Sequence, residues 1–366
     1  MFAFSIWNDQ TKKLFCVRDR LGIKPFYFSF HNGNFVFASE IKALLPLIGS
    51  HANYKAIQRY LIQGIYGYKN ETFFDNIYSL EPSHYMIICD NNIITTKRYW
   101  DIDDDNKFVD VDLAKNTYKE YMLDAINIRL RSDVPIGLNI SGGLDSSLLM
   151  GSISKFNDHK LHAYTYTCGD SKYDESKHAR KLAKHFNHIW NKVVFSKEEF
   201  LPFLFQMQWY QEEPFGGLPT IVHSRIFHLA KSQGVSVILC GAGMDEQWCG
   251  YDYYQNAFNS INDVSVIQGT STPLAQQVLN RDFVETYCPI EYSKKFKSNI
   301  DNLKYRDLFV TKIPRALRFF DRMSMQYSVE LRVPFLDHEI VELSFKMPNE
   351  FMIKDGNRKY LLRKIA

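Results

Sequence analysis

Residues 139–147 read NISGGLDSS and join two apolar runs. The preceding run, VPIGLNI (134–140), is typical of a short buried strand, and the following run, SSLLMGSISKF (146–156), is typical of a helix. Two glycines, three serines and one aspartate therefore stand where a strand passes into a helix. The carboxyl ends of strands in open α/β sheets are where such proteins bind their ligands.

The sequence around this stretch alternates between strand and helix patterns. We expect helices over 113–130, 174–186 and 220–234, and further strands over 161–168, 192–195 and 235–240. Alternation of this kind predicts βαβ units around a largely parallel sheet, which is an α/β fold. The chain from about residue 255 is predicted to be mainly helical.

The first hundred residues have a different pattern. Short aromatic or β-branched runs, separated by turn residues, predict a β-rich domain over 1–100 with one helix near 53–64. The predicted strands are FAFSIW, KLFCVRD, FYFSF, FVFAS and YMIIC. Residues 101–112 collect acids without periodicity and are interpreted as a solvated linker before a second domain, 113–366. The alternative is an acidic surface loop inside one domain.

Composition excludes several functional classes. The 366 residues carry 44 Lys and Arg against 41 Asp and Glu, so no strong field for nucleic acid or membrane is expected. Six scattered cysteines without a CxxC pair argue against a zinc site or redox dithiol and favour reduced thiols. These are Cys16, Cys89, Cys168, Cys240, Cys249 and Cys288. With no signal peptide or membrane span recognised, a soluble cytoplasmic protein is expected, and a homodimer is left open.

The opening stretch has the chemistry of a phosphate cradle. The first amide N–H groups of a helix lack internal partners and favour an anion. Gly142 and Gly143 let the backbone approach that anion, while Ser141, Ser146 and Ser147 add hydroxyl donors. Asn139 and Leu144 complete the nucleotide-binding stretch. The alternative is an N-capped helix start without a ligand.

Asp145 is the unusual member of this stretch. The common P-loop places a lysine in this stretch, and residues 139–147 contain none. An acid within an anion site is explained if it holds a divalent cation that bridges phosphate oxygens. We therefore expect Asp145 to bind Mg²⁺.

The motif SGGLDSS resembles the pyrophosphate-binding loop of the N-type ATP pyrophosphatases, which include asparagine, argininosuccinate and GMP synthetases. The resemblance implies an adenine nucleotide alpha hydrolase-like fold, ATP as a bound cofactor, and cleavage between its α and β phosphates. VILCGAGMDEQWCGY (237–251) resembles the second nucleotide segment of asparagine synthetases. It implies that Cys240 and Gly241 contact the nucleotide and that Asp245 joins Asp145 on the metal. Alternatively, Asp245 and Glu246 are acids at a helix start.

Two later stretches resemble asparagine synthetases specifically. RALRFFDRMSMQYSVELRVPFLDHE (315–339) resembles the stretch that supports the substrate cleft, although structural ion pairs are favoured for most of its charged residues. These residues are Arg318, Asp321, Arg322, Glu330, Arg332 and Asp337. RKYLLR (358–363) resembles the K-x-x-L-R segment, which implies that Lys359 meets the α-phosphate and the acyl-adenylate. A solvated basic chain end is the alternative.

The N-terminal segments FAFSIWNDQTKKLFCVRDRLGIKPFYF and FVFASEIKALLPL resemble the later half of the family's N-terminal-nucleophile glutamine amidotransferase domain. In that domain a cysteine directly after the initiator methionine attacks glutamine, whereas residue 2 here is Phe2. Cys16 lies in an apolar strand pattern and is predicted to be a buried structural thiol. Glutamine hydrolysis by this chain alone is not predicted, and a fragment or a degenerate copy is expected.

The resemblance implies an asparagine synthase-type carbon–nitrogen ligase of amino-acid biosynthesis. Its carboxylate substrate, aspartate, becomes an acyl-adenylate with release of pyrophosphate. Ammonia, derived from glutamine in the full-length family, then gives asparagine and AMP. Lys359, Asp145 and Asp245 are the predicted catalytic residues. Ala242 departs from the family's glutamate, so another carboxylate, such as a uronic acid in polysaccharide assembly, stays open, as does a non-catalytic nucleotide-binding module.

Overall fold

The structure is a computed structural model that describes residues 1–366 except 104–106, 157–159, 168–173, 197 and 259–277. The chain forms two compact units, 1–104 with 251–318 and 105–250 with 319–366. Part of the predicted linker, and Cys168 at the end of a predicted strand, lie outside the described residues. No helix in the described ranges combines the length and apolarity that crossing a membrane requires.

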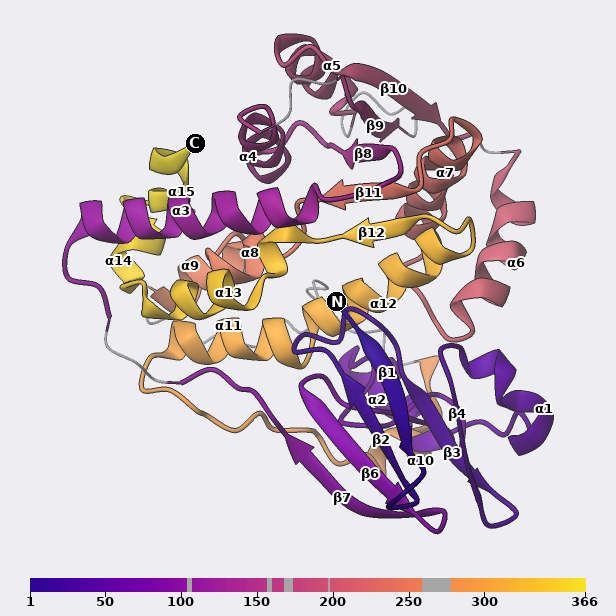
Figure 1. Cartoon of the computed structure of the whole chain (residues 1–366). Coiled ribbons are helices and arrows are strands. Elements are labelled where there is room, and N and C mark those ends of the chain that lie inside the picture. Colours follow the sequence, from indigo (N-terminus) through magenta and orange to yellow (C-terminus); the bar gives the residue numbers. More distant parts are fainter. Residues whose placement is uncertain (104–106, 157–159, 168–173, 197, 259–277) are drawn as a thin grey trace. The chain divides into compact units, whose positions relative to one another are not determined.

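The first unit is built on two antiparallel sheets, drawn in indigo and violet in Figure 1. One has the order β1-β2-β6-β7 and the other β4-β3-β5. Their strands are β1 Ala3–Asn8, β2 Lys13–Arg18, β3 Tyr27–His31, β4 Asn34–Ala38, β5 Tyr78–Ser79, β6 His84–Cys89 and β7 Asn92–Arg98. Cys16 from β2 and Phe28 from β3 share one buried cluster, so both sheets contribute to one core.

Two features of these sheets bear on the predictions. Cys16 is fully buried and burial raises its pKa to about 12, which confirms the expectation of a structural thiol. Strand β1 forms an edge of its sheet and carries exposed Phe4, Ile6 and Trp7. Strands β5 and β7 were not predicted, because the short YS and the polar NIITTKR lack the aromatic pattern of the other strands.

The helices of this unit lie in both of its segments, 1–104 and 251–318. They are η1 Ile41–Ala43, α1 Leu45–Ile48, α2 Tyr54–Gln63, α9 Asp252–Phe258, α10 Arg281–Glu285, α11 Asn299–Phe309 and the start of α12 Lys312–Met325. The predicted helix near 53–64 is confirmed as α2, which Asn53 caps and Gly64 ends in a left-handed conformation.

Residues 251–318 group with the N-terminal unit, which differs from the predicted domain range 113–366. Side-chain hydrogen bonds explain the grouping. The amide of Gln58 donates to the carbonyl of Phe283 at 2.6 Å, and the guanidinium of Arg98 donates to Tyr305 at 2.7 Å. Such contacts join residues more than 200 positions apart, so no local sequence pattern announces them.

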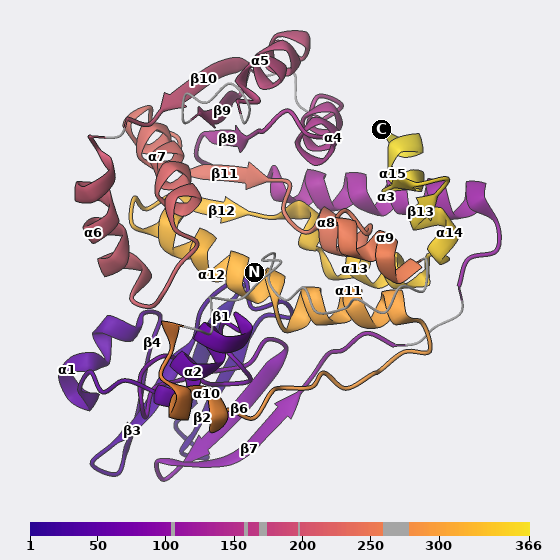
Figure 2. The same cartoon turned by 180° about the vertical axis from the view of Figure 1, so that it is seen from behind.

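The second unit contains a five-stranded parallel sheet in the order β10-β9-β8-β11-β12, seen from opposite sides in Figures 1 and 2. Its strands are β8 Ile136–Asn139, β9 His162–Thr167, β10 Ile189–Val194, β11 Val237–Cys240 and β12 Glu330–Arg332. The predicted α/β fold with a parallel sheet, preceded by a β-rich part, is confirmed. Strand β12 was not predicted because its three residues, ELR, carry no strand pattern.

The helices of the second unit are α3 Val111–Arg129, α4 Leu144–Ile153, α5 Ser176–His185, α6 Phe200–Gln211, α7 Leu218–Ser232, α8 Met244–Gln247, η3 Pro334–Leu336, α13 His338–Lys346, α14 Asn349–Met352 and α15 Tyr360–Ile365. Of these, α3, α4, α5 and α7 match predicted helices within a few residues, whereas α6 was not predicted. A small hairpin, β13 Ile353–Lys354 with β14 Asn357–Arg358, precedes α15. Asp110 caps α3, so the predicted linker runs directly into a helix.

Candidate nucleotide and metal site

The candidate site lies where the order of the parallel strands reverses. Strands β8 and β11 are neighbours, and Asn139 at the end of β8 pairs with Cys240 at the end of β11. The chain goes from β8 outward to β9 and β10 on one side, and from β11 to β12 on the other. The crevice at such a switch point is the usual ligand site of open α/β sheets. Both glycine-containing turns predicted to bind nucleotide begin there.

Gly142 fixes the path of the turn after β8. Its φ is +87°, and a Cβ atom would lie 2.8 Å from Cβ of His178 and 2.9 Å from the backbone N of Ala179. Only glycine fits that backbone and that space. Gly143 has an extended φ of −72°, and its Cβ would meet only the Ser141 hydroxyl at 3.3 Å. Of the two predicted glycines, Gly142 is the one that the turn requires.

The serine hydroxyls, which were predicted as donors to an anion, make hydrogen bonds within the turn. Ser146 Oγ accepts hydrogen bonds from the amides of Ser141, at 3.3 Å, and Gly142, at 3.1 Å. Ser146 and Ser147 both donate to the carbonyl of Gly143, at 3.1 and 2.8 Å. Because these hydroxyls are engaged within the turn, they shape the cradle before any ligand arrives.

The donors left for an anion are main-chain amides. No side chain caps α4, so the N–H groups of Leu144 and Asp145 in its first turn have no intrahelical partner. The dipole of this ten-residue helix adds partial positive charge at the same end. The first turn of α4 is therefore suited to a phosphate, as predicted.

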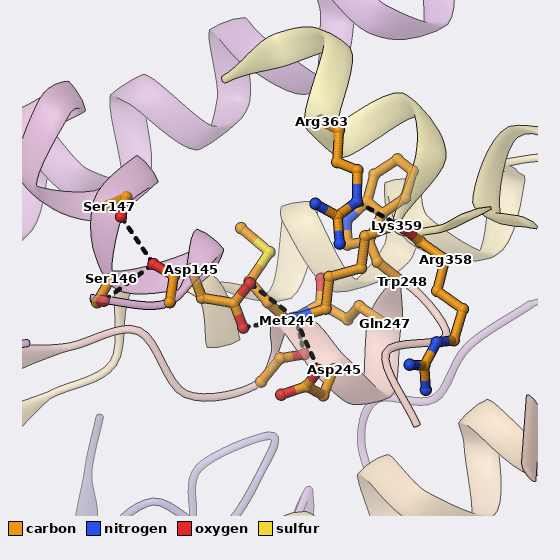
Figure 3. A network of polar contacts seen from close by, with 12 residues as sticks. Asp145, Ser146, Ser147, Met244, Asp245, Gln247, Trp248, Arg358, Lys359 and Arg363 are labelled. Atoms are coloured by element: carbon orange, nitrogen blue, oxygen red, sulfur yellow. Dashed lines mark hydrogen bonds and ion pairs between the residues drawn. The ribbon is translucent and has the colours of Figure 1, made fainter. Parts of the chain in front are cut away.

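Asp145, Asp245 and Lys359 meet at one point (Figure 3). Nζ of Lys359 lies 2.7 Å from both carboxylate oxygens of Asp145 and 2.7 Å from Oδ1 of Asp245. The side chains of Lys359 and Asp145 are only 9% and 19% exposed. The three predicted catalytic side chains thus converge from α4, α8 and the residue before α15.

Burial dominates the electrostatics of this cluster. It raises the pKa of Asp145 above its ordinary value, the Lys359 ammonium opposes that rise, and the Asp245 carboxylate adds to it. Arg363 on α15 also favours the ionised form of Asp145. Asp145 therefore needs a cation nearby to stay charged.

The donor set of the cluster fits Mg²⁺. Asp145 and Asp245 direct carboxylate oxygens to one position, and Mg²⁺ binds through one or two carboxylates while it keeps several waters. A position where two carboxylates already stabilise an ammonium group is also one where they can stabilise a metal ion. Asp145 and Asp245 are the residues that would hold it.

A cavity of about 270 Å³ opens beside the cluster. Six of the predicted residues line it, namely Asn139, Ser141, Asp145, Ser146, Cys240 and Gly241, together with Ile140, Thr165, Tyr166, Glu175 and His223. Gly142, Gly143, Leu144, Ser147, Asp245 and Lys359 are not among its lining residues. The cavity thus joins the ends of β8, β9 and β11 to helix α7.

The inner wall of this cavity is uncharged. Burial lowers the pKa of His223 to about 4, and its ring is hydrogen-bonded to the side-chain amide of Asn139. Burial raises the pKa of the Cys240 thiol to about 11. Both groups are neutral near pH 7, so the cavity is neutral at this wall and charged at Asp145. That polarity suits a nucleoside joined to a phosphate chain.

Sequence reasoning missed His223, Thr165 and Gly250. His223 lies inside a helix pattern and Thr165 inside a strand pattern, where neither is distinguishable from a structural residue. A Cβ atom on Gly250 would lie 2.6 Å from Cε of Lys359 and would overlap the Asp245 carboxylate. Glycine at this position makes room for the cluster, a requirement visible only once the three segments are assembled.

Comparison with known proteins identifies the family. The model of the asparagine synthase family matches residues 117–366. The chain belongs to the asparagine synthase family. The model of a glutamine amidotransferase domain matches residues 1–100, so both predicted resemblances are confirmed. The predicted fold class, a parallel-sheet ATP-pyrophosphatase domain after a β-rich amidotransferase part, agrees with both matches.

Curated relatives carry more than one name. A putative asparagine synthetase of Methanocaldococcus jannaschii is 32% identical over 70% of this chain and 51% of its own length. Asparagine synthetase 1 of Bacillus subtilis is 27% identical over 100% of this chain and 65% of its own length. Amidase chry2 of Gibberella zeae is 26% identical over 99% and 65%. The chain spans about half to two thirds of the length of these relatives.

Proposed function

We propose that this chain carries the synthetase site of an ATP-dependent amide-forming ligase. The observation that supports it most directly is the meeting of Asp145, Asp245 and Lys359 beside a cavity at the switch point of the sheet. Next to them, the first turn of α4 offers unpartnered amides. Carboxylates for a metal, a lysine for a phosphate and amides for a leaving anion are the groups that nucleotidyl transfer from ATP needs.

The neutral part of the cavity would take the nucleoside of ATP. His223 and Cys240 line it without charge, whereas Asp145 and the amides of α4 lie toward the phosphates. In this orientation the β- and γ-phosphates rest on the first turn of α4, and the α-phosphate comes within reach of Lys359. The same arrangement brings the bond to be broken next to the carboxylate pair.

The first step joins a substrate carboxylate to AMP. A carboxylate oxygen attacks the α-phosphorus, and the bond from that phosphorus to the oxygen shared with the β-phosphate breaks. Its electron pair leaves with pyrophosphate. The amides of Leu144 and Asp145 hold the departing pyrophosphate, and Lys359 stabilises negative charge that develops on the α-phosphate. When bound to Asp145 and Asp245, Mg²⁺ supplies further positive charge against the phosphates.

The second step forms the amide. The nitrogen of ammonia attacks the acyl carbon, the carbon–oxygen bond to AMP breaks, and one proton passes from nitrogen to solvent. Ala242 has a methyl side chain and cannot accept that proton. Aspartate is the first acceptor to test, since relatives are named asparagine synthetases. A uronic acid is the second, because Ala242 departs from the family's glutamate.

The test is pyrophosphate release by the purified chain. It is incubated with ATP, Mg²⁺ and ammonium chloride, with aspartate, a uronic acid or no acceptor. Release that depends on one acceptor, with the matching amide detected by mass spectrometry, supports the ligase and identifies its substrate class. Nucleotide binding without acceptor-dependent release would contradict catalysis and favour a non-catalytic nucleotide-binding module.

Asp145→Asn supplies the matched variant for this assay. Loss of one of two carboxylates that would hold the metal should reduce pyrophosphate release at least about 100-fold. Asp124→Asn is the control, because Asp124 is an exposed acid on α3. Equal rates for Asp145→Asn and Asp124→Asn would remove Asp145 from the proposed mechanism.

A further inference from the structure

Lys359 occupies the position that the proposed function gives to a metal ion. Its ammonium nitrogen lies 2.7 Å from oxygens of both Asp145 and Asp245. A divalent cation bound to the same two oxygens would need that same space. An ammonium group and a metal ion also repel each other at such a separation. The ammonium group of Lys359 therefore takes the place between the two carboxylates that the proposed function assigns to the metal ion.

The fold holds this lysine in place. Lys359 has φ +54°, a left-handed conformation that is uncommon for a residue with a side chain, and lies between the β13–β14 hairpin and α15. Its side chain is 9% exposed, and Gly250 leaves room for its Cε atom. A lysine on a free chain end would instead be solvated. The backbone conformation at Lys359 and the space left by Gly250 thus position its ammonium group between Asp145 and Asp245.

The charges facing the cluster explain why the ammonium group of Lys359 lies between the two carboxylates. The largely buried Asp145 carboxylate needs positive charge, and the partly exposed Asp245 carboxylate beside it adds to that need. Lys359 supplies one positive charge, while Arg363 lies further out on α15. A metal ion arriving alone must displace the ammonium into a poorly solvated surrounding, which is costly. A nucleotide changes this, because its phosphates offer the ammonium a new anionic partner.

We propose that Lys359 keeps free divalent metal out of the Asp145–Asp245 pair until a nucleotide phosphate takes over its ammonium group. The proposal rests on the proposed function, which assigns the two aspartates to the metal. It gives Lys359 two positions in one cycle, between the carboxylates in the empty site and on the α-phosphate in the filled one. Metal and nucleotide then enter together.

The experiment measures Mn²⁺ binding without nucleotide, from the electron paramagnetic resonance signal of free Mn²⁺. The wild-type chain is expected to bind Mn²⁺ weakly. Lys359→Met removes the ammonium and should bind Mn²⁺ about tenfold more tightly or better, since one positive charge next to the ion is lost. Lys359→Arg keeps the charge and should bind as weakly as the wild type. In Lys359→Met, a further Asp145→Asn change should abolish the gain.

Lys364→Met is the matched control, because it removes the same charge from an exposed residue of α15. Its Mn²⁺ affinity should equal that of the wild type. Circular dichroism checks that each variant folds, and Lys359→Gln answers the same question if the methionine variant does not. The proposal is overturned if the wild type binds one Mn²⁺ as tightly as Lys359→Met, or if Lys364→Met shows the same gain.

The outcome separates this inference from the proposed function. Acceptor-dependent pyrophosphate release together with tight Mn²⁺ binding by the wild type would retain the ligase and reject the role of Lys359 in excluding metal. A gain of Mn²⁺ affinity in Lys359→Met without any pyrophosphate release by the wild type would retain the exclusion and reject the ligase.

Discussion

The turns that follow β8 and β11 start from paired residues, Asn139 and Cys240, yet they provide different chemistry. After β8 the chain enters the ten-residue helix α4, whose first-turn amides are unpartnered. After β11 it enters the four-residue helix α8 through Gly243, which has φ +101°. The first turn offers main-chain donors to an anion, and the second presents a carboxylate.

Packing explains the difference. The side-chain amide of Gln247 in α8 donates to the carbonyl of Phe335 at 2.6 Å, and the indole N–H of Trp248 donates to the hydroxyl of Tyr118 at 2.7 Å. These fully buried contacts fix α8 from beneath and leave Asp245 partly exposed at 39%. The turn after β8 is instead held by its own serines. The anion-binding turn at the start of α4 is thus held by neighbouring residues. The Asp245 carboxylate opposite it is held by contacts of α8 with residues far away in the sequence.

Among the glycine substitutions, the largest effect is expected from filling the space at Gly250, which tests the turn after β11. Gly250→Ala places a methyl group against the Asp245 carboxylate and Lys359 Cε, so these side chains must separate. Pyrophosphate release should fall at least about tenfold, since small displacements of catalytic groups are costly. Gly143→Ala is the control, because its Cβ meets only a serine hydroxyl. Unchanged turnover in Gly250→Ala would contradict the tight packing described for the cluster.

A smaller effect is expected in the turn after β8. Gly142→Ala forces a side chain into a left-handed conformation and against the backbone of Ala179. Nucleotide affinity, measured by isothermal titration calorimetry, should weaken about tenfold, while Gly143→Ala should change it less than about threefold. Equal losses in both variants would mean that the two glycines contribute alike, contrary to their different backbone conformations.

The last effect is on stability instead of catalysis or nucleotide binding, and it concerns pH and the residue bonded to the end of β8. The pKa of His223 is lowered to about 4 from an ordinary 6.5, so folding is favoured above pH 6.5 by keeping the ring neutral. That contribution is lost as pH falls from about 6.5 to 4, at up to about 1.4 kcal/mol per pH unit. Urea unfolding at several pH values measures it. His223→Asn should lack this part of the pH dependence, and an identical profile would contradict the lowered pKa of the His223 ring.

The sequence predicts the turn after β8 well because its determinants are local. SGGLDSS contains the glycine, the serines and the aspartate that the structure uses, between a strand and a helix that propensity alone predicts. It does not show that the hydroxyls of Ser146 and Ser147 donate to the carbonyl of Gly143 within the turn. The identity of a serine does not show whether its hydroxyl bonds to the nearby backbone or is available to a ligand.

The turn after β11 and the cavity wall were less predictable for a physical reason. Asp245 and Lys359 were assigned to the site because their segments resemble those of asparagine synthetases. Neither segment by itself shows that the two side chains meet. His223, Thr165 and Gly250 matter only because α7, β9 and the end of the β11 turn are brought together by the fold. Strand β12 pairs with β11 through residues 330–332, which no local pattern distinguishes from coil.

The open side of β1 has a practical consequence for anyone who makes this protein. Within the described residues, β1 pairs only with β2, and Phe4, Ile6 and Trp7 are exposed along it. An edge strand that has unpaired amides and carbonyls and exposed apolar side chains can pair with the same strand of another molecule. Concentrated solutions of the protein should therefore form oligomers through this strand. Ile6→Lys places a charge on the edge strand, which opposes such pairing, and should keep the protein monodisperse in light scattering.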